Sequence, residues 1–216
     1  MNEQVTVALP AVSSSDFTHF VLYYRIYVSY LNLTGFSLSA SNLRDINPAL
    51  YSDYTYLSFY TSTSTTTTVN IASVMTNRNY QPLYFENSSG DISSGVLTSP
   101  GIQIQLHFPQ LADQSNPPYL SLPGNSMMKL KRSNGGGAFT PIPQHRYFLN
   151  NDELNSDGNI NTTVNADVAA PNVSGGSSNR YAYVAMYIAT AGINEQTYTP
   201  IFSIPSFVGI FFLPNN

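Results

Sequence analysis

The chain has 216 residues, of which 42% are hydrophobic and 9% charged, and its net charge is −4. Ordinary soluble domains carry about 25% charged residues. Only eight Lys or Arg residues are present, which argues against nucleic-acid binding driven by phosphate contacts. The absence of cysteine excludes disulfides, thiolate zinc sites and thiol nucleophiles. No membrane span is predicted, because the longest apolar run, at 207–213, is far shorter than the about 20 residues required.

Residues 1–18 are predicted to form an N-terminal arm, and residues 19–216 a single domain. The arm has no basic region followed by an apolar segment, so it does not resemble a signal peptide. Val5, Val7 and Leu9 alternate before Pro10, and residues 13–15 are all serine. This pattern is typical of a strand on a flexible link, which we expect to add to the sheet of an adjacent copy. Pairing within its own domain, or a frayed end, is the alternative.

The segment 19–30, HFVLYYRIYVSY, predicts a strand because its side chains alternate between an aliphatic face and a tyrosine-rich face. The segment 180–190, RYAYVAMYIAT, repeats the pattern. We expect the two aliphatic faces to share one core, formed by Tyr24, Ile26, Val28, Val184, Met186 and Ile188. The tyrosine faces either cover the second side of the same sandwich or meet a partner. On the second interpretation the subunit-interface candidates are Tyr23, Tyr27, Tyr181, Tyr183 and Tyr187, together with Val5, Val7 and Leu9 of the arm.

Helical spacing occurs in one region, where Leu43, Ile46, Leu50, Tyr54 and Leu57 recur. It predicts one or two short helices across 41–60, capped by Ser41 or Asn42. The Ser/Thr run at 61–68 is expected to be a loop or an exposed edge, and 71–77 to form a short helical turn.

Further strands follow from alternation and turn residues. We expect a strand at 102–108, a hairpin of 119–122 and 126–132 around a turn at 123–125, and a turn at 133–137 leading into 138–142. Strands at 201–204 and 207–213 are separated by Pro205. The chain is therefore predicted to be mainly β, a single antiparallel β-sandwich or jelly-roll-like domain with its helices around 41–60.

No catalytic residue and no cofactor site is predicted. His19, His107 and His145 are not spaced as metal ligands. Asp152, Asp157 and Asn159 form the strongest metal candidate, a calcium site, although such Asn-Asp-Gly clusters are usually plain turns. Lys129, Lys131 and Arg132 either guard a strand edge, which we favour, or contact an anion or glycan.

Several strings resemble a known family: YYRIYVSY, LRDINPALYSDY, NRNYQPLYF, RYFLNNDELNS, TTVNADV and RYAYVAMYIATAG with PIFSIPSFVGIFFLP. They are similar to an uncharacterised family of surface-type proteins, often lipid-anchored, of gut Firmicutes. The resemblance spans about residues 20–214 and implies an extracellular location. It implies no activity, and residues 1–18 lack the leader of that family.

Low charge, tyrosine-faced strands and a polar Ser/Thr/Asn surface favour a non-enzymatic structural subunit. We expect it in an extracellular self-assembling structure, either a cell-surface filament or pilus-like fibre, or a virion. Its partners would be copies of itself. The alternative is an extracellular binding module for a glycan, a peptide or a host surface, although the chain lacks the Trp that sugar sites favour. An enzyme ranks last.

Overall fold

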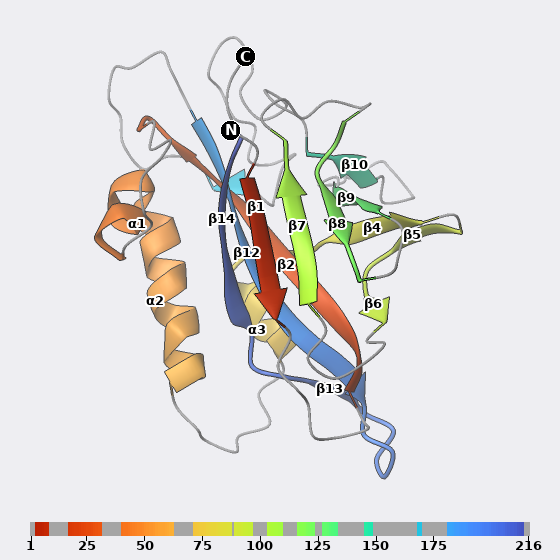
Figure 1. Ribbon diagram of the computed structural model, residues 1–216. Helices are drawn as coiled ribbons and strands as arrows, with labels where there is room; N and C mark the ends of the chain where they lie inside the picture. Colours follow the sequence, from red (N-terminus) through yellow and green to blue (C-terminus); the bar gives the residue numbers. More distant parts are fainter. Residues whose placement is uncertain are drawn as a thin grey trace, which may run out of the picture.

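The computed structural model describes the chain in eleven segments, drawn as ribbon elements and connections in Figure 1. These are residues 3–8, 17–31, 40–62, 71–87, 89–96, 103–109, 116–123, 127–133, 145–148, 168–169 and 181–213. They form a mainly β fold of three layers: sheet A, sheet B packed against it, and a layer of helices over the far face of sheet B.

Sheet A has the strand order β1-β7-β8-β9-β4-β5, with β10 also paired to β9, and all its described pairings are antiparallel. Its strands are β1 (Glu3–Ala8), β7 (Gln103–Phe108), β8 (Tyr119–Ser121), β9 (Met128–Ser133), β4 (Tyr84–Asn87), β5 (Gly90–Ile92) and β10 (His145–Tyr147).

Sheet B has the order β11-β2-β12-β13, with β14 on β12 and with β3 and β6 on β2. Its pairings are antiparallel except that of β11 with β2. Its strands are β2 (Phe17–Ser29), β3 (Gln81–Pro82), β6 (Gly95–Val96), β11 (Val168–Ala169), β12 (Tyr181–Ile193), β13 (Pro200–Phe202) and β14 (Ser206–Leu213).

The two tyrosine-rich segments of the sequence are the central pair of sheet B. β2 and β12 are each 13 residues long and run antiparallel from Tyr181 opposite Ser29 to Gly192 opposite Phe17. Both faces of this pair are buried. Alternate side chains along each strand therefore enter two different cores, and neither face is left to solvent. This pairing gives the fold its longest ladder of main-chain hydrogen bonds.

The core between the sheets takes the aliphatic faces of β2 and β12. It contains Phe20, Leu22, Tyr24, Ile26, Val28, Ala182, Val184, Met186 and Ile188 from sheet B, packed against Ile104, Leu106, Leu120, Leu130, Phe85 and Phe108. All six residues expected to share one core therefore do so. Aromatic edge contacts add to it, as between Phe20 and Phe85, whose ring centroids are 5.8 Å apart.

Helices α1 (Ala40–Ile46), α2 (Pro48–Ser62) and α3 (Ile71–Asn77) cover the tyrosine face of sheet B. The helices predicted across 41–60 are confirmed, as is the helical turn at 71–77. The residues at helical spacing, Leu43, Ile46, Leu50 and Leu57, are buried against the sheet. Thr61 and Ser62 of the expected loop continue α2.

Asn47 joins the two helices and ties them to the sheet. Its side-chain oxygen accepts a hydrogen bond from the Ala49 amide at 2.9 Å, so Asn47 caps α2, and Pro48 takes the first helical position. Its amide nitrogen donates to the Val28 carbonyl of β2 at 3.0 Å. One side chain thus fixes both the start of α2 and its position over β2.

Some of the other strand predictions are confirmed, and others fall outside the described residues. β7, the β8–β9 hairpin, β13 and β14 lie close to the ranges expected from alternation. Of the turn expected at 123–125 only Pro123 is described, and the strand expected at 138–142 falls outside the described residues. The edge-guard interpretation of Lys129, Lys131 and Arg132 is wrong, because β9 is paired on both sides, with β8 and β10 on one and β4 on the other. Arg132 is buried.

The burial of Ile188 on β12 predicts a large loss of stability on truncation. Ile188→Ala leaves a cavity between the sheets and should lower the free energy of unfolding by about 2–5 kcal/mol. Ile193, on the same strand, is 57% exposed, so Ile193→Ala should cost less than about 1 kcal/mol. Urea unfolding of both variants measures the difference. Equal costs would mean that β12 is not central.

Candidate functional site

The tyrosine-rich face of sheet B lies inside the molecule. Tyr23, Tyr27, Tyr183 and Tyr187 are buried in the cluster beneath the helices, and Tyr181 is partly buried against the same cluster. The chain's own α1, α2 and α3 therefore occupy the position in which a partner subunit was expected. This corrects the assignment of these five tyrosines to a subunit interface and supports the other interpretation, a covered second side of the sandwich.

The remaining predicted site residues are placed only in part. Val5 and Val7 lie in β1, opposite Leu106 and Ile104 of the chain's own β7. Leu9 and the calcium candidates Asp152, Asp157 and Asn159 fall outside the described residues. Within the described segments no group of three or more His, Cys, Asp or Glu side chains could hold a metal ion.

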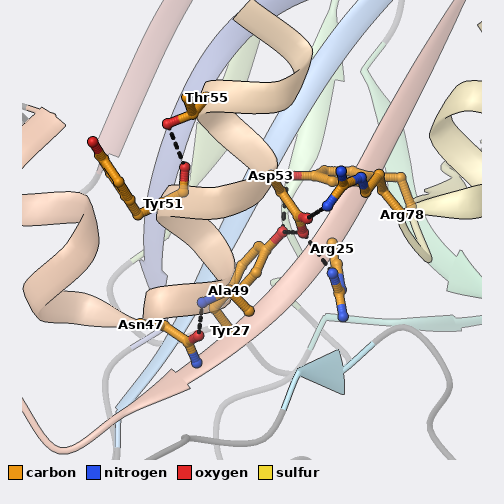
Figure 2. A network of polar contacts seen from close by, with 9 residues as sticks. Arg25, Tyr27, Asn47, Ala49, Tyr51, Asp53, Thr55 and Arg78 are labelled. Atoms are coloured by element: carbon orange, nitrogen blue, oxygen red, sulfur yellow. Dashed lines mark hydrogen bonds and ion pairs between the residues drawn. The ribbon is translucent and has the colours of Figure 1, made fainter.

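A buried carboxylate organises the polar contacts between sheet B and the helices (Figure 2). Asp53 projects from α2 toward β2, and only 4% of its side chain is exposed. Its Oδ2 accepts hydrogen bonds from Arg25 Nη1 at 2.5 Å and from the Tyr27 hydroxyl at 2.6 Å. Its Oδ1 lies 3.3 Å from Nη1 of Arg78, which follows α3. One carboxylate therefore links β2, α2 and the end of α3.

Aromatic rings surround this buried carboxylate. The Tyr27 proton is used on Asp53, so the Tyr80 hydroxyl, 3.0 Å away, donates to the Tyr27 oxygen. The Tyr80 and Tyr187 rings meet edge to face at 5.3 Å. The guanidinium of Arg78 lies 3.7 Å from the centre of the Tyr56 ring, a cation–π contact. Burial raises the pKa of Tyr27 and of Tyr80 well above the usual value, and the nearby Asp53 charge adds to the effect. Both phenols stay protonated and act as neutral donors.

These contacts perform a structural task. A buried carboxylate is costly unless opposite charges and hydrogen-bond donors compensate it. Arg25, Arg78 and Tyr27 provide that compensation here. This cluster therefore anchors the helices on sheet B. None of its described members presents a reactive group to solvent.

A second polar cluster lies on the outer face of sheet A, where β4, β5, β9 and β10 meet. Lys131 Nζ lies 3.1 Å from both Glu86 Oε2 and Asp91 Oδ1. His145 Nδ1 lies 2.9 Å from Asp91 Oδ2, and the Tyr147 hydroxyl donates to Glu86. The side chains of Glu86, Asp91, Lys131 and His145 are 17–34% exposed. The cluster therefore faces solvent, although its members are bonded to one another.

Hydrogen bonds set the electrostatics of this outer cluster. The hydrogen bond from Tyr147 lowers the pKa of Glu86. Burial opposes ionisation of Asp91, but hydrogen bonds from Lys131 and His145 outweigh it and lower the Asp91 pKa. Burial likewise works against the charge of Lys131, whereas its two carboxylate partners raise its pKa. The three groups are therefore charged at neutral pH.

Two flat ring pairs flank the outer cluster. Tyr84 and His145 stack with centroids 3.5 Å apart, and His107 and Tyr119 stack at 4.4 Å. Partial burial lowers the pKa of His107, and Ser121 Oγ lies 3.4 Å from its Nε2. Among the described residues, no Asp or Glu carboxylate is bonded to His107. Ser121 and His107 therefore lack the third member of a hydrolytic triad.

Comparison with protein-family models, curated proteins and solved structures gives no match. None of the helices among the described residues has the length and apolar character needed to cross a membrane.

The anchoring role of Asp53 predicts a severe effect of removing its charge. Asp53→Asn leaves Arg25 and Arg78 without their shared counter-ion and should lower the free energy of unfolding by about 3–5 kcal/mol. Asp45→Asn on the exposed side of α1 is the matched control and should change stability by less than about 0.5 kcal/mol. Thermal and urea unfolding measure both. A similar small effect of the two substitutions would contradict the anchoring role.

Proposed function

We propose that the chain is a non-enzymatic structural subunit of an extracellular self-assembling structure, a cell-surface filament or pilus-like fibre, or a virion. Copies join by exchange of β1, which leaves the sheet of its own chain and pairs with β7 of a neighbour. The supporting observation is the position of β1 at the end of sheet A, in a six-residue antiparallel register with β7.

The connectivity around β1 suits such an exchange. β1 belongs to sheet A, whereas β2, the next described element along the chain, is in the middle of sheet B. β1 also lies beside β14, at the edge of sheet A that approaches sheet B (Figure 1). An identical strand from a second copy makes the same main-chain hydrogen bonds to β7. Exchange therefore costs little.

The geometry of exchange also fits growth into a fibre. If each copy donates β1 to the next without reciprocation, the contact is head-to-tail and does not close, which produces an open filament. Reciprocal exchange would give a closed dimer. The low charge content of 9% leaves few like-charge repulsions between packed copies.

Strand exchange predicts a disulfide between different copies. Thr6 on β1 and Gln105 on β7 are direct neighbours across the strand pair, and the chain has no cysteine of its own. A mixture of Thr6→Cys and Gln105→Cys proteins, assembled at high concentration and then oxidised, should give covalent heterodimers on non-reducing gels. In addition, deletion of residues 1–15 should abolish assembly and leave a folded monomer.

Ser121 provides the control for chance proximity. Ser121 lies on β8 and pairs with Gln105 from the side opposite to β1, so it is one strand farther from Thr6. A mixture of Thr6→Cys and Ser121→Cys proteins should therefore form no disulfide between them. A full-length protein that stays monomeric in size-exclusion chromatography at high concentration would contradict the proposal, as would equal crosslinking of the two mixtures.

A further inference from the structure

The outer face of sheet A combines aromatic rings and hydrogen-bonding groups across neighbouring strands. Tyr119 on β8 lies directly opposite Lys129 of β9, and Tyr84 on β4 lies directly opposite Lys131. Tyr147 on β10 is the other neighbour of Lys131. From β7 to β5, no described strand position on this face carries an aliphatic side chain, since the aliphatic positions all point into the core between the sheets.

The charges of this face balance. Lys129 and Lys131 are matched in number by Glu86 and Asp91, so these four side chains together carry no net charge. Each charge is also held in place: Lys131 bridges the two carboxylates at 3.1 Å, and Lys129 Nζ lies 5.5 Å from the centre of the Tyr147 ring. A neutral ligand with many hydroxyl groups complements such a face, because each hydroxyl can both donate to a carboxylate and accept from an ammonium or imidazole group.

The rings and charges are preorganised. Stacking fixes Tyr84 against His145 and Tyr119 against His107, and ion pairs fix the side chains between them. Little rotamer freedom then remains to be lost on binding. From strand spacing and rise, the Cα atoms of Tyr119 and Tyr84 lie about 12 Å apart, two strands across and two residues along. Two aromatic platforms at that separation suit a chain of several sugar rings.

We propose that the outer face of sheet A binds a neutral oligosaccharide. The carbon-bound hydrogens of the sugar rings pack on Tyr119, Tyr147 and Tyr84, while Glu86, Asp91 and Lys129 bond the hydroxyl groups between them. An apolar peptide fits less well, because the described strand positions of this face carry no aliphatic side chain to form the core of such an interface. This inference does not depend on the exchange of β1, which lies at the end of the same sheet.

The test is a calorimetric titration of the full chain with cellotetraose, N-acetylchitotetraose and mannotetraose, and with a hyaluronan tetrasaccharide as the anionic arm. We expect at least one neutral probe to bind, with the hyaluronan probe weaker. Tyr119→Ala should weaken binding by about tenfold or more, equivalent to 1.4 kcal/mol. Glu86→Gln, which keeps the shape of the side chain, should also weaken it and serves as the second variant if Tyr119→Ala does not fold.

Tyr51→Ala is the matched control, because Tyr51 is an exposed tyrosine on α2, in a different layer of the molecule. It should leave the affinity unchanged. Failure of all three neutral probes at millimolar concentration would overturn the proposal. So would tighter binding of the hyaluronan probe, or binding that Tyr119→Ala and Glu86→Gln leave unchanged in folded protein.

Discussion

The antiparallel pairing of β2 with β12 is the constraint on which the rest of the structure depends. Both strands are buried on both faces, with sheet A on one side and the helices on the other. A strand in that position has few places for a charged side chain, since each unpaired buried charge is costly. The absence of Lys and Glu from 19–30 and 180–190 therefore follows from burial within one chain. It does not require a partner subunit to cover these strands.

The same constraint explains why the second core uses tyrosine. Arg25 lies on the inner face of this layer and needs a counter-charge, which Asp53 of α2 provides at 2.5 Å. A carboxylate so placed needs further donors, and the hydroxyls of Tyr27 and Tyr80 complete the network. Phenylalanine would supply the same apolar ring without the donor. Tyr27 and Tyr80 are thus apolar packing residues whose hydroxyl groups help to compensate one buried charge, whereas the Tyr183 hydroxyl donates to the Leu31 carbonyl.

Sequence reasoning reached the elements with long, regular patterns. Alternation in 19–30 and 180–190 identified β2, β12 and their shared core, and the spacing of Leu43, Ile46, Leu50 and Leu57 identified the helices. It did not identify what covers the tyrosine face, because alternation assigns residues to a face and says nothing of the neighbouring layer. The cap at Asn47 was missed, although Asn before Pro at the start of a helical pattern is a usable signal.

The two polar clusters could not be predicted from the sequence for a related reason. Asp53 and Arg25 are 28 residues apart, and the outer cluster joins Glu86, Asp91, Lys131 and His145 from four strands. Strands of two to four residues, such as β4 and β5, are too short for a periodic pattern. The sequence favours an edge position for Lys131, because local composition does not reveal the strand order of sheet A, in which β9 lies between β8 and β4.

The alkaline titration of tyrosine in the monomer tests most directly whether this face is buried within one chain. Burial raises the pKa of Tyr23 to about 12, and it raises the pKa of Tyr27, Tyr80 and Tyr187 well above the usual value. The folded state then retains these protons above pH 10 whereas the unfolded state releases them, so stability falls as pH rises beyond 10. At a concentration where chromatography shows a monomer, part of the phenolate absorbance should appear only with the loss of the far-ultraviolet circular dichroism. If every tyrosine of the monomer titrates near pH 10 while the fold persists, the helices do not cover this face.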